Sequence, residues 1–432
     1  MRVALVHDWL TGMRGGERCL QAFLALYPQA DIYTLLHVPG TTSLRIDQSV
    51  KGTSFINRLP GARRYYRLLL PLYPLAARSF RLVDYDMVIS LSHAVAKNVH
   101  VPDSALHLVY CFTPMRYIWD QAHVYFGGAT AVMWPLIKAL RRWDLSCSER
   151  PDQFVAISRF VAARIRCFYG RKAAVVYPPV DASWITPVKP TAAGSAPPGK
   201  AFLCAGALVP YKRVDLVVQA FNRLKLPLWV VGSGPEEGKL RRMAKSNISF
   251  YGAVSDQSLA EFYRQCRALV FPAREDFGLM PVECMAAGRP VICLSEGGCS
   301  ETVVGLRPWD CSNNSLLDAS QATGVFIRRA AAREVDSLME SIEFFIRHER
   351  LFSVEACVRR AAEFSLKSFC NSWNSLPEVA AMLNMPSSSL CQDAQARSGT
   401  PVLRAKNAST MGTGSGSLYV RNRNQSRKAA PC

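Results

Sequence analysis

Short apolar runs alternate with segments of helical periodicity in two separate stretches of the chain, and this alternation restricts the fold more than any other feature. In the first stretch the apolar runs cover residues 3–7, 87–91, 106–111, 154–157 and 173–177. In the second stretch they cover residues 201–205, 228–231, 248–251, 268–271 and 290–293. Strands that are apolar throughout and separated by helices are typical of parallel sheets covered on both faces. The sequence therefore predicts an α/β chain with two Rossmann-like domains that face a central cleft.

The boundary between the two stretches lies at residues 186–200, where Pro, Gly and Ala residues replace the periodic pattern. This composition is typical of a linker, so we expect one domain over residues 1–185 and a second over residues 201–365. Helical periodicity continues further, and residues 366–384 are expected to form a C-terminal helix that packs back on the first domain. Residues 385–432 are rich in Ser, Asn, Gly and Arg, which predicts a disordered basic tail.

The chain of 432 residues carries a formal net charge of +19, which indicates an acidic partner such as nucleic acid, anionic lipid or a phosphorylated substrate. No helix-turn-helix, zinc or RNA-recognition signature is present, so nucleic acid is not expected, although a basic nucleic-acid-binding protein stays the alternative from another class. The cysteines are scattered without a CxxC pair, which is typical of free thiols in a reducing compartment. Without a signal-peptide pattern or a run of about 18 apolar residues, we expect a cytoplasmic protein.

Two glutamates eight positions apart, Glu275 and Glu283, form the most informative pattern of the second stretch. Glu275 follows the expected strand 268–271, and Glu283 falls in the first turn of the next expected helix. Between them Gly278 allows the backbone to approach a ligand, and the helix N-terminus offers free N–H groups to an anion. These groups together suit a nucleotide sugar, which has sugar hydroxyls, a diphosphate and a ribose diol.

The stretch 274–292 resembles the signature of glycosyltransferase family 4, a family of retaining enzymes with the two-domain GT-B architecture. The match includes the glutamate spacing, the flanking prolines and the Ala-Gly pair after the expected helix. The resemblance implies an acceptor-binding first domain and a donor-binding second domain. It implies that Glu275 contacts the transferred sugar as a catalytic residue and that Glu283 binds the nucleotide ribose. The loop residues implied to bind the donor are Phe277, Gly278 and Leu279.

Other parts of the second stretch resemble the same family. The segment around Lys212 is similar to the family's phosphate-binding basic segment, which implies a catalytic cation at Lys212 and a donor contact at Arg213. Many members carry an arginine where Ala207 stands here, so a two-cation clamp on the diphosphate would depend on Arg213. Gly232 follows one strand and Tyr251 ends the next, and both positions are implied to contact the donor.

The first stretch contributes a glycine turn and two strand-end side chains. Gly15 and Gly16 stand at a helix start, where backbone N–H groups can cradle a phosphate or a sugar. The turn lacks the full G-x-G-x-x-G pattern, which disfavours an NAD-dependent oxidoreductase. By resemblance, His93 is the family's catalytic cleft histidine. Arg116 lies in a segment similar to bacterial polysaccharide enzymes of the family and is implied to bind acceptor phosphate.

The expected reaction needs no cofactor and no metal. No His/Cys ligand cluster appears, and no Asp-x-Asp follows a strand where a metal-bound diphosphate would need it. The cations Lys212 and Arg213 would then neutralise the diphosphate, and the resemblance implies retention through a short-lived ion pair. Residues 6–17 resemble bacterial surface-polysaccharide mannosyltransferases, which favours transfer of mannose from GDP-mannose to a lipid-linked or polysaccharide acceptor. A nucleotide-sugar-dependent synthase acting on a soluble acceptor stays the alternative.

Residues 55–80 combine five arginines with tyrosines and leucines, and Arg81 follows directly. Basic residues interleaved with aromatic and aliphatic ones suit an anionic membrane interface. We therefore hypothesise peripheral contact with the inner face of the membrane, while a structural Arg-rich surface is the alternative. The sequence leaves the oligomeric state open.

Overall fold

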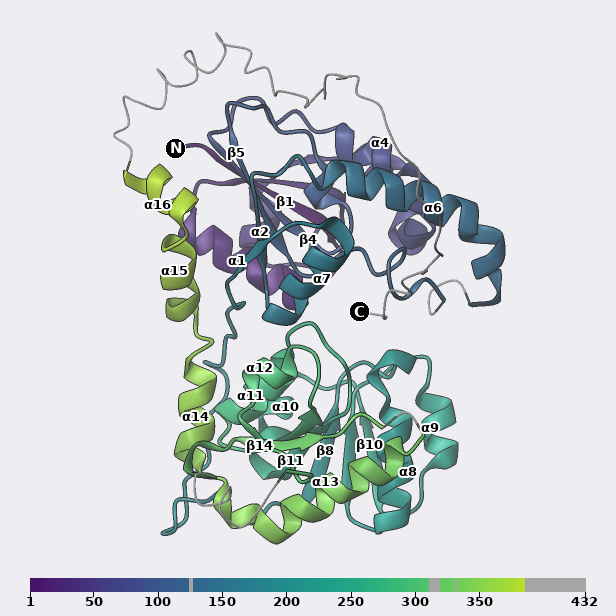
Figure 1. The fold of residues 1–432 in the computed structure, drawn as a ribbon, viewed down its shortest axis with the longest axis vertical. Helices are drawn as coiled ribbons and strands as arrows, with labels where there is room; N and C mark the ends of the chain where they lie inside the picture. The colour runs from purple at the N-terminus through teal and green to yellow at the C-terminus, as the bar shows by residue number, and fades with distance from the viewer. Residues whose placement is uncertain (124–126, 311–318, 331, 385–432) are drawn as a thin grey trace, which may run out of the picture.

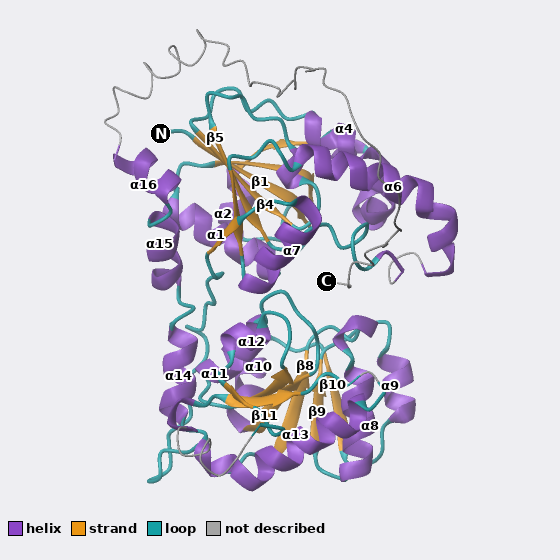
Figure 2. Ribbon diagram, viewed as in Figure 1, coloured by secondary structure: helices purple, strands orange, loops and turns teal. Residues whose placement is uncertain are grey.

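The protein consists of two α/β lobes stacked along its long axis (Figure 1). The computed structural model describes residues 1–123, 127–310, 319–330 and 332–384. In each lobe, helices surround a central sheet (Figure 2). The predicted fold of two Rossmann-like domains with a helical C-terminal segment is confirmed. The predicted basic tail at 385–432 lies outside the described residues.

The first sheet has seven parallel strands in the order β3-β2-β1-β4-β5-β6-β7. These are β1 (Val3–Leu10), β2 (Asp31–His37), β3 (Val50–Thr53), β4 (Met87–Ser92), β5 (Leu106–Cys111), β6 (Gln153–Ala156) and β7 (Ala173–Val175). The strand order reverses at β1, which pairs with β2 on one side and β4 on the other. The segments after β1 and β4 therefore leave the carboxyl edge of the sheet beside each other, where ligands of open α/β sheets bind.

The second sheet repeats this plan in the order β10-β9-β8-β11-β12-β14-β13, again with parallel neighbours. Its strands are β8 (Ala201–Ala205), β9 (Leu228–Val231), β10 (Ile248–Gly252), β11 (Cys266–Phe271), β12 (Val291–Leu294), β13 (Gly305–Leu306) and β14 (Gly324–Ile327). Here the order reverses at β8, so the segments after β8 and β11 lie side by side.

The helices cover both sheets. The first domain has α1 (Gly15–Leu26), α2 (Leu44–Ser49), α3 (Ala62–Tyr65), α4 (Tyr73–Arg78), α6 (Thr130–Cys147) and α7 (Arg159–Tyr169). The second has α8 (Val214–Leu224), α9 (Glu237–Met243), α10 (Asp256–Gln265), α11 (Leu279–Ala286), α12 (Cys299–Thr302) and α13 (Glu334–His348). Local signals set their ends: α7 begins where Ser158 Oγ accepts the N–H of Val161 at 3.0 Å, and ends at Gly170 with φ +66°.

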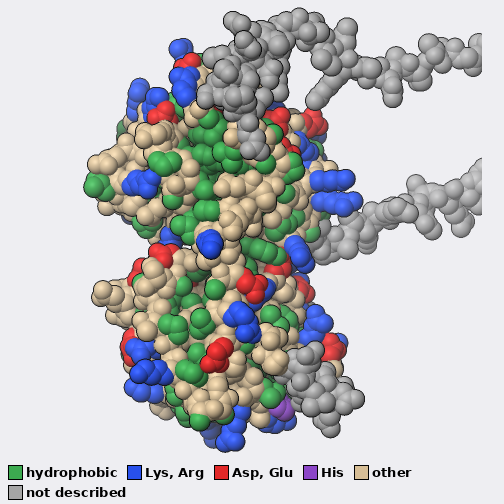
Figure 3. All heavy atoms as spheres, turned by 90° about the vertical axis from the view of Figure 1, so that its left-hand side faces the viewer, with side chains coloured by type: hydrophobic (Ala, Val, Ile, Leu, Met, Phe, Trp, Pro, Cys, Tyr) green, Lys and Arg blue, Asp and Glu red, His purple; other side chains and the backbone are tan. Residues whose placement is uncertain are grey.

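Three C-terminal helices run along both lobes: α14 (Val354–Ala362), α15 (Leu366–Asn374) and α16 (Pro377–Asn384). Helix α14 packs on α11 of the second domain. Helix α15 packs on α1 of the first, where Trp373 donates from Nε1 to the Tyr27 hydroxyl at 2.9 Å and meets the Phe23 ring edge-on at 4.6 Å. Figure 3 shows this side of the molecule, with a waist between the lobes and charges of both signs scattered over the surface. The chain thus joins the two lobes twice, through the segment between them and through these helices.

The structure also corrects parts of the sequence analysis. The continuous apolar runs form strands as predicted, but β2, β3, β13 and β14 were not predicted. Within the described residues, ten cysteines are free thiols. Among the described helices, none has the length and apolar character needed to cross a membrane.

Candidate active site

A cavity of about 440 Å³ lies between the two domains. It is bounded by the segments that follow β1, β4 and β5 in the first sheet and β8 and β11 in the second. Nine predicted site residues line it: Gly15, Gly16, His93, Arg116, Lys212, Glu275, Phe277, Gly278 and Leu279. The switch points of both sheets therefore face one shared space, as the sequence analysis expected of a two-domain chain.

On the second-domain wall, Lys212 and Glu275 form an ion pair. The ammonium lies 2.5 Å from Glu275 Oε1, and each side chain is less than a fifth exposed. Lys212 ends a short 3-10 turn, Pro210–Lys212, after β8, and its ammonium lies 5.1 Å from the centre of the Phe271 ring. Partial burial strengthens the attraction of this cation for phosphate oxygens. The pair thus places an anion-binding group beside a carboxylate that can accept hydrogen bonds from hydroxyl groups.

Glycines stand where neighbouring atoms leave no room for a side chain. A Cβ at Gly15 would lie 2.7 Å from Leu279 Cδ1, across the interface between α1 and α11. A Cβ at Gly16 would lie 3.1 Å from His7 Nε2. Gly278, at the start of α11, has φ +94° and would place a Cβ 2.7 Å from Cys299 Sγ. These positions accept only glycine without rearrangement, which explains the glycine turns on both walls.

Asp276, next to Glu275, connects the two walls. Its carboxylate accepts hydrogen bonds from Arg116 and, at 2.9 Å, from Arg164, and its backbone carbonyl accepts one from Ser158 Oγ at 2.6 Å. All three partners belong to the first domain. Burial alone would raise the pKa of Asp276, but the two guanidinium groups outweigh it and hold that pKa below its ordinary value. The loop that carries Glu275 is thus anchored to the opposite domain.

Arg116 therefore lies in the cavity wall with part of its guanidinium already engaged. Burial tends to lower its pKa, but Asp276 and Glu275 together raise it above the ordinary value. Its Nε atom is buried and has no hydrogen-bond partner among the described residues. An anion or a hydroxyl of a ligand could accept a hydrogen bond from this Nε atom. Acceptor binding by Arg116 stays a prediction, and Nε is the atom that would make the contact.

Glu283 does not line this cavity. It is buried within α11, where it accepts a hydrogen bond from the Tyr263 hydroxyl at 2.9 Å and lies 3.7 Å from an Arg18 guanidinium nitrogen of the first domain. Burial raises its pKa, and the Tyr263 bond and Arg18 offset this only in part. Its predicted contact with a ribose would require the ligand to reach the Arg18 side of α11.

Three other predicted donor contacts lie outside the cavity lining. Arg213 pairs with Glu334 through both terminal nitrogens, at 3.1 and 2.7 Å. Gly232 approaches the backbone of Gly206, so that a Cβ would lie 1.9 Å from its carbonyl oxygen. Tyr251 is 46% exposed. Their predicted contacts with a donor stay predictions.

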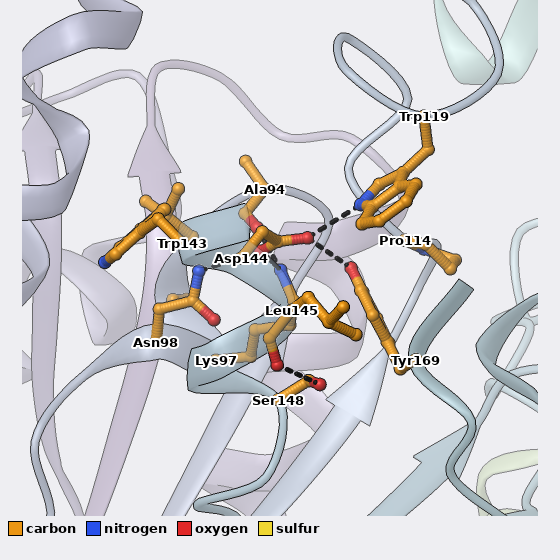
Figure 4. A network of polar contacts seen from close by, with 12 residues as sticks. Ala94, Lys97, Asn98, Pro114, Trp119, Trp143, Asp144, Leu145, Ser148 and Tyr169 are labelled. Atoms are coloured by element: carbon orange, nitrogen blue, oxygen red, sulfur yellow. Dashed lines mark hydrogen bonds and ion pairs between the residues drawn. The ribbon is translucent and has the colours of Figure 1, made fainter. Parts of the chain in front are cut away.

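A buried ionic network lies in the first domain, among the segments after β4 and β5 (Figure 4). Lys97 lies 2.7 Å from Asp144, and both side chains are fully buried. The same carboxylate accepts hydrogen bonds from Asn98, Trp119 and Tyr169 at 2.8 to 2.9 Å. It thereby connects the segment after β4, the segment after β5, α6 and α7. A fully buried pair contributes little net stability, so we assign to it the placement of these segments.

Sequence reasoning missed three residues that shape the site: Asp276, Arg164 and Asp8. The contacts of Asp8 are described in the further inference. Asp276 stands beside the predicted Glu275, but its partners Arg116 and Arg164 lie more than a hundred positions away, and the sequence contains no sign of their pairing. For metals, no group of three or more His, Cys, Asp or Glu side chains suited to hold an ion occurs in the described part of the chain.

Comparisons with known proteins show what the chain is similar to. Residues 199–319 match the model of the family described as Glycosyl transferases group 1. The chain is 35% identical over 103 residues to the O-antigen chain mannosyltransferase C of Escherichia coli, covering 22% of this chain and 28% of that one. It is 26% identical over 197 residues to the GDP-mannose-dependent monoacylated alpha-(1-6)-phosphatidylinositol monomannoside mannosyltransferase of Corynebacterium glutamicum, covering 40% and 52%.

Among solved structures, sucrose-phosphate synthase from Thermosynechococcus elongatus superposes with a TM-score of 0.63 at 15% identity, covering 89% of this chain and all of that one. This similarity concerns the fold. The sequence matches to the two mannosyltransferases span only about a quarter and about half of their lengths. The matched segment contains Lys212, Glu275 and Glu283. Residues 199–319 therefore match the glycosyl transferases group 1 family, within a chain whose two domains have the GT-B fold.

Proposed function

We propose that the protein is a retaining glycosyltransferase that moves a hexose, namely mannose from GDP-mannose, to a lipid-linked or polysaccharide acceptor. The observation that carries this proposal is the Lys212–Glu275 pair, which faces His93 and Arg116 across a cavity between two domains. The family match includes both residues of the pair. The names of the two mannosyltransferase relatives support mannose, and one of them includes GDP-mannose.

In the proposed complex, Lys212 pairs with the donor diphosphate and Glu275 accepts hydrogen bonds from hydroxyls of the transferred sugar. Donor binding then exchanges the internal ion pair for two contacts with the ligand, so neither charge is left without a partner. Glu283 binds the ribose. The backbone N–H groups at Gly278 and the start of α11 face the phosphates. Neither a metal nor a cofactor is part of the proposal.

The proposed reaction forms and breaks one bond at the anomeric carbon. The bond from C1 to the diphosphate oxygen breaks and leaves a short-lived ion pair of an oxocarbenium-like sugar and the nucleoside diphosphate. The acceptor oxygen then bonds to C1 on the same face, and its proton passes to the departing phosphate oxygen. Lys212 stabilises the charge that develops on that phosphate. A protein base is not required, because the leaving group takes the proton.

A transfer assay tests this function. GDP-mannose labelled in its sugar is incubated with the protein and a lipid extract of bacterial membranes, with and without a chelator. We expect label in the organic phase in both cases, and the α-anomer of the donor retained in the product by NMR. A product with inverted configuration contradicts the proposed mechanism. No transfer from any GDP- or UDP-sugar contradicts the function itself.

We further propose that the first domain rests on an anionic membrane, next to such an acceptor. In the segment from α3 to α4, Leu68 is 74% and Leu75 is 60% exposed, and Arg63, Arg64 and Arg78 are exposed beside them. Exposed apolar side chains among arginines suit the headgroup region. Sedimentation with anionic vesicles is expected to be lost in Leu68→Ser/Leu75→Ser, whereas equal binding of the variant or none by the wild type at moderate salt contradicts the proposal.

A synthase acting on a soluble acceptor is the second candidate, favoured by the fold similarity to sucrose-phosphate synthase. The two candidates differ in where the product is found. With soluble sugar phosphates as acceptors, a synthase leaves the label in the aqueous phase, whereas the proposed transferase leaves it with lipid or polysaccharide.

A further inference from the structure

Asp8, at the carboxyl end of β1, binds a whole turn of backbone with one side chain. Its carboxylate accepts N–H groups from four consecutive residues, His93, Ala94, Val95 and Ala96, at 2.7, 2.9, 2.6 and 2.7 Å. The side chain is fully buried. These donors begin directly after β4, so the carboxylate fixes the path of the segment that starts with His93.

The same carboxylate also meets the His93 ring. Asp8 Oδ2 lies 3.2 Å from His93 Nδ1. An ionised carboxylate can only accept, so Nδ1 carries the proton, and Nε2 is the ring nitrogen directed away from Asp8. The Trp9 ring packs edge-on against the imidazole at 4.5 Å. His93 lines the interdomain cavity with about a quarter of its side chain exposed.

Asp8 is ionised despite its burial. Burial tends to raise its pKa, but His93 and the backbone N–H groups outweigh it and hold the pKa below the ordinary value. A buried carboxylate is costly unless its charge is fully hydrogen-bonded. Here the carboxylate is satisfied on all sides, and its one side-chain partner is a residue of the cavity wall.

We propose that Asp8 is a positioning residue of the transfer reaction, which holds His93 with Nδ1 protonated and directs Nε2 toward the bound sugar. This inference rests on the proposed function. It explains why the first strand ends in an acid that does not itself line the cavity. Asp8 acts through the orientation of one ring and makes no contact with the ligand.

The first test does not depend on activity. In wild-type protein labelled with ¹⁵N at histidine rings, the His93 resonances are assigned by their loss in His93→Gln. We expect Nδ1 to be protonated, as the Asp8 contact requires. A neutral ring with the proton on Nε2 overturns the proposal, and this result is independent of whether any sugar is transferred.

The second test is a double-mutant cycle on kcat and on the donor KM. Asp8→Asn is expected to lower kcat about 10- to 100-fold, because misplacement of a catalytic group by about 1 Å can cost about 100-fold. His93→Ala is expected to lower kcat at least as much, and the double variant no further than His93→Ala alone. If the kcat of the double variant falls by the product of the two single losses, the proposal is overturned, since Asp8 would then act independently of His93.

Ser90→Ala is the matched control. Ser90 is fully buried on β4, three positions before His93, and its hydroxyl bonds to His107 Nε2 at 2.9 Å. We expect its kcat to stay within about twofold of the wild type, because the change is away from the cavity. If Asp8→Asn does not fold, the ring measurement on the wild type still decides the matter. A wild type that transfers no sugar contradicts the proposed function and leaves the ring result standing.

Discussion

At the scale of residues, the charged groups of the cavity already have partners within the protein. Lys212 pairs with Glu275, and Arg116 with Asp276. A ligand must therefore replace these contacts, and its binding energy depends on what it offers in exchange. A diphosphate next to a polyhydroxylated sugar offers an anion for the lysine and hydroxyls for the carboxylate. An uncharged sugar alone would separate the Lys212–Glu275 pair without replacing it.

Glu275→Gln tests the role of this carboxylate. The substitution keeps the shape and removes the charge, so we expect kcat/KM to fall about 100-fold, or about 2.7 kcal/mol of lost transition-state stabilisation. Glu296→Gln is the control, because Glu296 pairs with Arg274 and Arg329 nearby but does not line the cavity. Steady-state transfer kinetics check both variants. Equal activities of the two would contradict the assignment.

Glu283→Gln, compared with Tyr263→Phe, separates a ligand role from a structural one. If Glu283 binds a ribose, its variant raises the donor KM about tenfold, since a hydrogen bond to a charged group contributes about 1.5–3 kcal/mol. Tyr263→Phe removes only the internal bond, so we expect an unchanged KM and about 1 kcal/mol of lost stability. Donor titrations and thermal melts measure both. A KM that stays constant in Glu283→Gln would show that the glutamate serves only Tyr263.

At the scale of elements, the site depends on how closely the strand ends of each sheet approach. Gly206 follows β8 and Gly232 follows β9, and the two backbones meet where no side chain fits. This contact places the turn that leads to Lys212. The same principle applies across the domains, where Gly15 of α1 meets Leu279 of α11. Glycine thus sets the width of the site on both walls.

Gly232→Ala is expected to destabilise the protein by about 3 kcal/mol. The alanine Cβ would lie 1.9 Å from the Gly206 carbonyl oxygen, and Gly232 has φ +128°. Steric overlap and backbone strain therefore both oppose the substitution. Gly238→Ala, in α9, meets nothing closer than Arg242 at 3.6 Å and should be neutral or slightly stabilising. Denaturant unfolding of both variants tests this. A mild effect at Gly232 would mean that the strand ends are further apart than described.

Element patterns were predictable, whereas the contacts between elements were not. Apolar runs such as 106–111 and 201–205 coincide with β5 and β8 because burial on both faces demands continuous hydrophobicity. Strand β2 was not predicted because Tyr33 and Thr34 interrupt its apolar run. Glu275 and Lys212 could be predicted from local motifs. The bonds of Asp8 to residues 93–96 could not, because only the pairing of β1 with β4 brings them together.

At the scale of the whole molecule, acids of the second domain contact donors of the first. Asp276 binds Arg116 and Arg164, and Glu301 accepts the N–H groups of Arg159 and Phe160 at the start of α7, both at 2.7 Å. A carboxylate at a helix N-terminus is electrostatically favourable. These contacts hold the two domains together around the cavity. The geometry of the site is therefore coupled to the arrangement of the domains.

The stability that the Asp276 contacts contribute should decrease as the pH falls. The pKa of Asp276 in the folded protein lies below its ordinary value of 3.8, so its stabilisation is complete above that value and is lost as the pH falls through the folded-state pKa. We expect Asp276→Asn to be less stable than wild type by about 3 kcal/mol at neutral pH. The difference in Tm should shrink toward pH 3, and a difference that widens on acidification would contradict this account.

The central claim is that the interdomain cavity binds an activated sugar, and the most direct measurement is a thermal-shift panel on the wild-type protein. It compares GDP-mannose, other nucleotide sugars, NAD and RNA. We predict that GDP-mannose raises Tm most, with a stabilisation of about 2.7 kcal/mol at 100-fold its Kd, and that the rise is absent in Lys212→Met. A panel in which no nucleotide sugar shifts Tm, while NAD or RNA does, would contradict the account.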